Sequence, residues 1–186
     1  MSKRIVVGLD GSPFAAGALY VALRRAKVYG STLIGVAVID RPRIEQTAAG
    51  AHPGAIQMSE STVSTLLNDA KARAETLIEE FRRACDSEQV PHEDIIFTGT
   101  PYEGLQKEGC TADLIVTGLR TYFHYPTQEG PGDTLTQLLK EPVCPVYATT
   151  ESDELPRNVI IAYDGSPGAA RALQAYAHIT PDSPEI

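Results

Sequence analysis

The sequence is poor in cysteine. It has only three, Cys85, Cys110 and Cys144, and they are too far apart to form a Cys-x-x-Cys pair. An odd number at these spacings argues against a disulfide framework and favours a reducing cytoplasm. We expect each of the three to be a small buried apolar residue, as free cysteines usually are. The four histidines are scattered without metal-ligand spacing, so the sequence predicts no metal site.

Long hydrophobic runs and positive charge are also scarce. No apolar stretch reaches the roughly 18 residues of a membrane span, and the N-terminus enters a strand pattern without the apolar region of a signal peptide. We therefore expect a cytoplasmic protein without a membrane partner. Lys and Arg number 16 against 24 Asp and Glu, which gives a net charge of −8. This balance argues against a nucleic-acid partner, because phosphate backbones are bound by basic surfaces.

One segment of the chain is present twice. Residues 3–19 read KRIVVGLDGSPFAAGAL, and residues 157–173 read RNVIIAYDGSPGAARAL. Both run from an apolar stretch through Asp-Gly-Ser-Pro into an Ala-rich helix, and self-similarity at a domain-sized spacing indicates a repeated domain. The sequence thus predicts one domain over 1–150, a linker over 151–156 and the start of a second domain over 157–186. In that second copy we expect a strand at 159–163 that pairs with another chain, or else disorder from residue 157 onward, because its apolar surface would otherwise be left in water.

Strands and helices alternate within the first domain. Strands are expected at 5–9, 32–39, 94–98, 113–117 and 144–149, and helices at 13–29, 59–85, 102–110 and 132–140. The stretch 40–58 is expected to be a long surface loop, because it holds two prolines and two glycines and has no periodicity. Such alternation requires a parallel sheet with helices on both faces. Ligands of these sheets bind at the carboxyl ends of the strands, which predicts a crevice around residues 10–12 and the loops after Val38 and Gly118.

Taken together, the ordered motifs resemble the universal stress protein family. They are DGSP after the first strand, ADLIVTG late in the domain and PVCPVYAT at its end. The resemblance covers residues 3–150 as a whole domain and 157–179 as the start of a second, truncated one. It implies an α/β fold with a five-stranded parallel sheet in the order 3-2-1-4-5 and helices on both faces, like the adenine-nucleotide alpha-hydrolases. It also implies a homodimer through the edge strand 144–149, and protein partners of unknown identity.

Members of this family that bind ATP carry a G-x2-G-x9-G-[ST] motif after the fourth strand. Glycines let backbone N–H groups approach phosphates, and a helix start favours negative charge. Here Gly118 and Gly132 match the first and third glycines, but Thr121 occupies the second glycine position and Asp133 the Ser/Thr position. Asp133 is expected to be a good helix N-cap that would repel a phosphate. Thr134 would replace the lost hydroxyl if the loop shifted by one residue.

The residues expected beside the adenosine part of a nucleotide match the family better than those of the phosphate motif do. By resemblance, Asp10 matches the aspartate near the base and ribose, and Val38 the residue whose backbone contacts the adenine edge. Asp10, Gly11 and Ser12 are equally ordinary turn and helix-cap residues, so both interpretations stay open. The aromatic run at 122–125 would stack on a base or cover an apolar ligand, or it would pack on the protein and fill the space of the phosphates. We expect self-packing.

The function expected from these residues is that of a universal stress protein acting as a non-catalytic regulatory or binding module with a degenerate ATP-binding loop. No catalytic constellation can be assembled from local spacing. The alternative is an adenine-nucleotide switch that holds ATP or AMP, with slow hydrolysis as an option. An ATP pyrophosphatase is disfavoured because DGSP lacks the glycine pair of that phosphate loop. The candidate binding residues are Asp10, Gly11, Ser12, Val38, Gly118, Thr121, Gly132 and Thr134.

Overall fold

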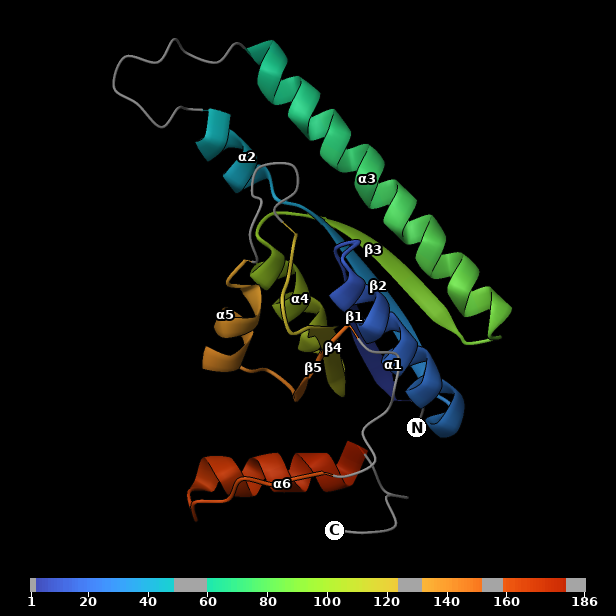
Figure 1. Cartoon of the computed structure of the whole chain (residues 1–186), viewed down its shortest axis with the longest axis vertical. Coiled ribbons are helices and arrows are strands. Elements are labelled where there is room, and N and C mark those ends of the chain that lie inside the picture. Colours follow the sequence, from blue (N-terminus) through green and yellow to red (C-terminus); the bar gives the residue numbers. More distant parts are fainter. Residues whose placement is uncertain (1–2, 49–59, 124–131, 152–158, 180–186) are drawn as a thin grey trace. The chain divides into compact units, whose positions relative to one another are not determined.

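The computed structural model describes residues 3–48, 60–123, 132–151 and 159–179 of the chain. It divides into two compact units, residues 1–152 and 153–186. The first unit alternates strands with helices (Figure 1). Its elements are β1 (Arg4–Leu9), α1 (Pro13–Tyr29), β2 (Thr32–Ile39), α2 (Arg41–Ala48), α3 (Glu60–Ser87), β3 (His92–Thr98), α4 (Pro101–Gly109), β4 (Leu114–Gly118), α5 (Thr134–Lys140) and β5 (Val146–Thr149).

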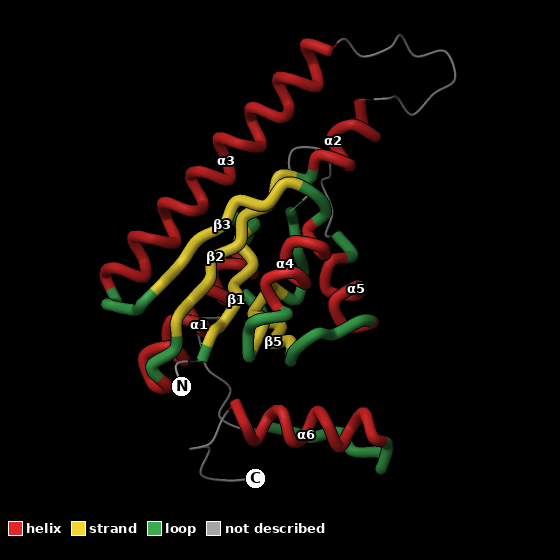
Figure 2. The backbone as a smooth tube through the Cα atoms, turned by 180° about the vertical axis from the view of Figure 1, so that it is seen from behind, coloured by secondary structure: helices red, strands yellow, loops and turns green. Residues whose placement is uncertain are grey.

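The five strands form one parallel sheet in the order β3-β2-β1-β4-β5, which confirms the predicted fold class. β1 is the central strand, with Ile5 opposite Leu33 of β2 on one side and Leu114 of β4 on the other. Helices α1 and α3 cover one face of the sheet, and α4 and α5 cover the other (Figures 1 and 2). This cover explains why nearly every residue of β1 and β2 is buried and why both strands read as continuous apolar runs.

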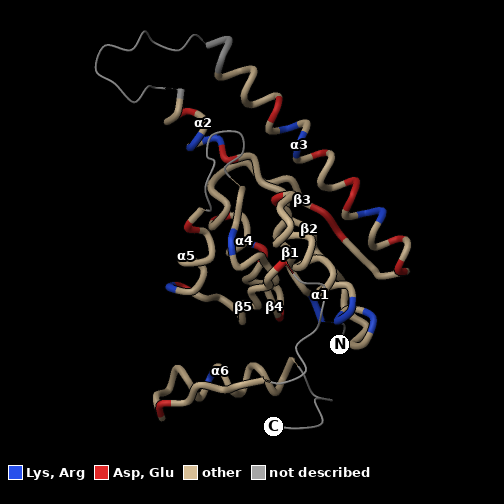
Figure 3. Tube along the Cα trace, in the orientation of Figure 1, with Lys and Arg blue, Asp and Glu red and all other residues tan. Residues whose placement is uncertain are grey.

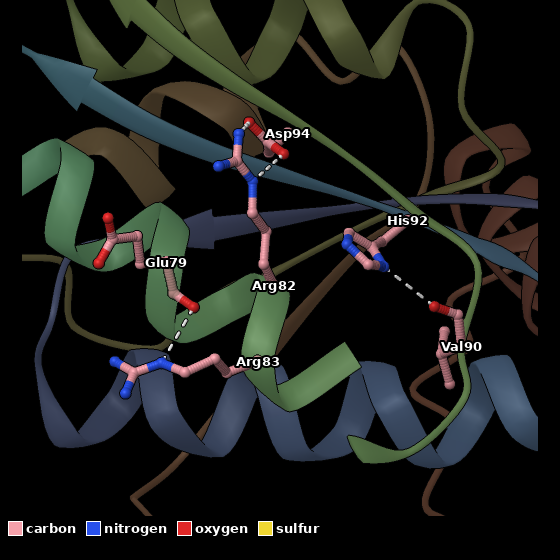
Figure 4. Close-up of polar contacts among 6 residues, drawn as sticks. All are labelled: Glu79, Arg82, Arg83, Val90, His92 and Asp94. Atoms are coloured by element: carbon pink, nitrogen blue, oxygen red, sulfur yellow. Dashed lines mark hydrogen bonds and ion pairs between the residues drawn. The ribbon is translucent and has the colours of Figure 1, made fainter. Parts of the chain in front are cut away.

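Helix α3 is held on the sheet by an apolar face and by one charged pair. The fully buried members of that face follow the predicted helical spacing: Ala70, Ala74, Ile78, Phe81 and Cys85. Acidic and basic residues recur along the helix (Figure 3). Near its C-terminal end, the Arg82 guanidinium donates two hydrogen bonds to the Asp94 carboxylate on β3, at 2.7 and 2.8 Å (Figure 4). This pair adds little to stability, because Arg82 is exposed.

The loop predicted over 40–58 is wrong in its first part, because α2 begins at Arg41. The Asp40 carboxylate accepts the backbone N–H of Arg43 at 3.1 Å, which is the geometry of a helix N-cap. Pro42 also suits a first helical turn, where its fixed φ is helical and its missing N–H has no partner to lose. The rest of the predicted loop, from residue 49 onward, lies outside the described residues.

The second unit contains one described helix, α6 (Pro167–Ile179). The strand expected at 159–163 does not form within this chain, where these residues have no regular secondary structure, and its pairing with another chain stays a prediction. Ile160 is 96% exposed and Tyr163 is 59% exposed. The reason is physical: a strand exists only where a neighbour accepts and donates its backbone hydrogen bonds, and no partner strand occurs among the described residues of this unit.

The cysteines do not share one environment. Cys85 is buried, Cys144 is half-buried, and Cys110, where α4 ends, is exposed, so the expectation of burial is wrong for Cys110. Loss of hydration raises the pKa of Cys85 to about 12 and that of Cys144 to about 11. Both of these thiols are therefore protonated near neutral pH. Among the described helices, none is long and apolar enough to cross a membrane.

Candidate functional site

The turn between β1 and α1 is built by four consecutive residues. The Asp10 Oδ1 accepts the backbone N–H of Ser12 at 2.9 Å, and the Ser12 Oγ accepts that of Ala15 at 3.2 Å, which caps α1. Gly11 has a φ of 74°, a conformation that glycine adopts without strain. Pro13 follows as the first helical residue. Asp10, Gly11 and Ser12 thus have local structural roles before any ligand is considered.

The same turn forms a second time before α6. Asp164 Oδ1 accepts the Ser166 N–H at 2.9 Å, and Ser166 Oγ accepts the Ala169 N–H at 3.1 Å. Gly165 has a φ of 80°. The hydrogen bonds from Ser166 lower the pKa of the exposed Asp164. Because this copy forms without a sheet among the described residues of its own unit, the turn is encoded locally and does not by itself indicate a binding site.

Asp10 differs from Asp164 in what else it contacts. It is only 3% exposed, and its Oδ2 accepts the backbone N–H of Tyr122 at 2.6 Å. Its carbonyl oxygen accepts a hydrogen bond from Arg73 of α3 at 2.8 Å. The Asp10 carboxylate therefore joins the end of β1 to the segment that follows β4. A ribose hydroxyl would compete with the Tyr122 amide for this oxygen.

The predicted crevice at the carboxyl ends of β1 and β2 is almost closed. A cavity of about 10 Å³ remains there. Ligand pockets are usually about 300–1,000 Å³, and about 10–15 Å³ holds a single water, so this space does not admit a nucleobase. It is lined by Leu9, Asp10, Val38, Ala70, Arg73, Ala74, Leu77, Tyr122 and Phe123.

Two aromatic residues after β4, Tyr122 and Phe123, close the crevice, and we call them the aromatic segment. Phe123 is 5% exposed, and its ring lies so close to Gly8 that a Cβ there would be 3.0 Å from the ring. Tyr122 stacks on Phe14 of α1 with ring centroids 6.4 Å apart. Both residues therefore pack on the protein, as expected. Residues 124 and 125 of the aromatic run lie outside the described residues.

The glycines of the degenerate phosphate motif have structural explanations. A Cβ on Gly118 would lie 2.6 Å from Phe14 Cβ and 2.7 Å from the carbonyl oxygen of Arg120. The Gly132 N–H donates to the Thr121 carbonyl at 2.7 Å, so this amide is already engaged. Thr121 is 1% exposed, and its hydroxyl has no hydrogen-bond partner in the described part of the chain. None of the three presents an open phosphate cradle.

The start of α5 also departs from expectation. Asp133 occupies the N-cap position, but its side chain makes no capping hydrogen bond, so the prediction of a good N-cap is wrong. Its φ of −97° and ψ of 6° are not the extended conformation that directs a cap side chain at the helix amides. Instead, Asp133 Oδ2 accepts a hydrogen bond from the Gln137 amide at 2.7 Å. Thr134 is 2% exposed, so its hydroxyl does not lie on an open surface.

Of the predicted site residues, the structure gathers Asp10 and Val38 around the nearly closed crevice, with Gly11 and Ser12 in the adjoining turn. Sequence analysis missed Arg73, whose Nη2 would lie 2.7 Å from a Cβ on Gly11. The signal was available, because this charge falls between apolar positions on the inward side of α3. Within the described residues, no cluster of three or more His, Cys, Asp or Glu side chains could hold a metal ion.

The fold and the first-strand turn agree with a comparison against family models. The model of the universal stress protein family matches residues 1–149. The chain belongs to the universal stress protein family. Among curated proteins, none matches it significantly.

Solved structures of other universal stress proteins share the fold. UspA from Lactobacillus plantarum is 21% identical, with 79% of this chain and 97% of that chain covered at a TM-score of 0.59. A family protein from Arabidopsis thaliana with AMP bound is 18% identical, with 84% and 97% covered at 0.54. The universal stress protein from Archaeoglobus fulgidus in complex with dAMP is 15% identical, with 80% and 98% covered at 0.53. The bound nucleotides are properties of those two relatives.

Proposed function

We propose that this universal stress protein is a non-catalytic regulatory or binding module. Its own aromatic segment would occupy the crevice around Asp10 and Val38, where an adenine would otherwise bind. The observation that carries the proposal is the 2.6 Å hydrogen bond from the Tyr122 N–H to the Asp10 carboxylate, with Phe123 buried beside it. A nucleotide would need both the carboxylate and the space taken by the ring. The protein would therefore act through its surface on other proteins.

The phosphate end of the crevice supports the same proposal. A triphosphate is held by free backbone N–H groups and by basic side chains. Here the Gly132 amide donates to Thr121, and the exposed Asp133 places a negative charge at the start of α5. No Lys or Arg lies between Thr121 and Asp133 in the sequence to offset that charge.

Calorimetric titration of Mg-ATP and AMP into the full chain, stripped of bound nucleotide, tests the proposal. We expect no saturable heat with either ligand at micromolar concentrations, because the crevice has room for about one water. The variant Phe123→Ala is expected to gain AMP binding, since it removes the ring that fills the site; a circular-dichroism melt verifies that it is folded. Micromolar binding of either nucleotide to the unmodified protein would refute the proposal.

The second candidate is an adenine-nucleotide switch, with slow hydrolysis as its only turnover. It is favoured by the position of Asp10 and Val38 around one cavity and by the nucleotides bound in the structures of relatives. In this case the aromatic segment would move aside on binding. AMP would be preferred to ATP, because fewer phosphate charges would approach Asp133. The same titration distinguishes the two candidates.

We also propose that the protein is a homodimer through β5. Among the described residues this strand pairs only with β4, which leaves its other edge without a described partner, and the nearby Leu139 and Val143 are 59% and 42% exposed. Light scattering is expected to give about twice the 20.0 kDa of one chain. Ala148→Lys, which puts a charge on the exposed edge, is expected to give a monomer. A monomeric unmodified protein across micromolar concentrations would contradict this assembly.

The repeated turn supports one further part of the proposal. We infer that residues 157–179 arose by duplication of the unit formed by β1 and α1. The supporting observation is the pair of matching hydrogen bonds around Asp10 and Asp164, together with the positive φ of Gly11 and Gly165. The copy would be the start of a second domain of the same family.

A further inference from the structure

A second cavity, of about 380 Å³, lies between α2 and the first turns of α4 and α5. It shares no lining residue with the nearly closed crevice around Asp10. Its volume lies within the range of pockets that hold small molecules. The question is which chemistry its walls would recognise.

Arg43 of α2 is one of the residues that line the second cavity. Its Nε is shielded from solvent, so this atom itself does not face the cavity. A planar guanidinium is suited to a two-oxygen acceptor. Arg43 therefore favours a ligand with a carboxylate or a phosphate.

The second cavity also carries negative charge, which helps to decide between a carboxylate and a phosphate. Asp40 and Asp133 both line the second cavity, from the end of β2 and the start of α5. Asp133 gives one oxygen to the Gln137 amide at 2.7 Å and is exposed, so it retains acceptor capacity. Two carboxylates against one guanidinium would repel a phosphate with its two negative charges. A ligand with one carboxylate and one ammonium matches both walls.

The remaining lining of the second cavity is suited to an apolar group. Pro42 and Pro101 contribute ring carbons, and Tyr102 contributes its aromatic ring. The Tyr102 hydroxyl already has hydrogen-bond partners. It donates to the Glu141 carboxylate at 2.9 Å and accepts from the side-chain amide of Gln106. These bonds hold the ring in place and leave its face for packing.

We propose that the second cavity binds a free α-amino acid with an apolar side chain. The carboxylate lies on Arg43, the ammonium lies beside Asp133, and the side chain packs on Tyr102 and the two prolines. Asp133 and Thr134 of the degenerate phosphate motif line this cavity, so the inference rests on the proposed function, in which no phosphate occupies that end of the crevice.

The test is calorimetric titration of L-leucine into the full chain, with two analogues that each lack one charge. We expect saturable binding of leucine with a Kd of about 1 mM or tighter. N-acetyl-leucine, which lacks the ammonium, and leucinamide, which lacks the carboxylate, are each expected to bind at least about tenfold more weakly. Inorganic phosphate is expected not to compete.

Single substitutions test which residue binds each charged group of leucine. Arg43→Gln and Asp133→Asn are each expected to weaken leucine binding at least about tenfold. Arg41→Gln is the matched control: Arg41 lies on the same helix, pairs with Glu45 and does not line the cavity, so affinity should not change. The proposal is overturned if leucine does not bind, or if both analogues bind as tightly as leucine does. It is also overturned if phosphate binds in a way that depends on Arg43. The analogues test it on the unmodified protein even if a variant does not fold.

Discussion

Replacing Phe81 with alanine is expected to lower the free energy of unfolding by about 3–5 kcal/mol. The Phe81 side chain is fully buried, with a relative exposure of 0%, and it anchors the apolar face of α3 on the sheet. Its ring lies directly against Gly35 of β2, where a Cβ would be 2.7 Å from the ring. His92 of β3 meets the same ring edge-on, with centroids 5.7 Å apart. Urea denaturation followed by circular dichroism measures the change.

The close fit of Phe81 and Gly35 gives this prediction an internal check. Gly35→Ala alone is expected to cost about 1–3 kcal/mol, because the added methyl group overlaps the ring. In the Phe81→Ala background the same methyl group enters the space that the ring has left. The loss in the double variant should therefore be smaller than the two single losses together by about 0.5–3 kcal/mol. Additive losses would show that the two residues do not share the packing described.

Asp10→Ala is expected to destabilise the first unit by about 1–3 kcal/mol for each of the two backbone N–H groups that lose their acceptor. These groups belong to Ser12 and Tyr122, and the carboxylate that accepts them is 3% exposed. The same measurement, urea denaturation by circular dichroism, gives the size of the loss. Asp10→Asn should cost less, since its amide oxygen can still accept.

The second copy of the turn supplies the matched control for Asp10. Asp164 makes the same local hydrogen bond to Ser166 but is exposed. Asp164→Ala is therefore expected to leave the urea unfolding curve almost unchanged. Equal losses of stability at Asp10 and Asp164 would mean that the Asp10 carboxylate matters only within its own turn. The hydrogen bond that joins β1 to the aromatic segment would then not contribute to stability.

The elements that the sequence predicted well are those whose signals are local. The helix 13–29 was predicted at both ends, because Ser12 and Pro13 start it and Gly30, with a φ of 62°, ends it. The strand 32–39 matches β2 residue for residue, since a strand buried on both faces is apolar throughout. Helix α2 was missed because it is short and polar, and its start depends on Asp40 more than on periodicity.

The errors and omissions arise where long-range contacts decide the structure. Residues 159–163 have the composition of β1, but a strand depends on neighbours that spacing does not reveal. The position of Phe123 in the crevice likewise depends on Gly8, which lies far away in the sequence and close in space. Asp10 was found by motif, whereas its bond to Tyr122 required the fold. Sequence therefore located the crevice and predicted that the aromatic run packs on the protein, but not that the Phe123 ring lies against Gly8.

The central position of β1 has a consequence for synthesis on the ribosome. One edge of β1 pairs with β2, the next strand in the sequence. The other edge pairs with β4, which comes much later in the sequence, with Ile5 opposite Leu114. The backbone N–H of Arg4 also donates to Asp113, at 2.9 Å. While the chain emerges from its N-terminal end, β1, β2 and β3 can assemble under α1 and α3 with the edge of β1 unpaired. That edge stays open to wrong pairing until β4 arrives.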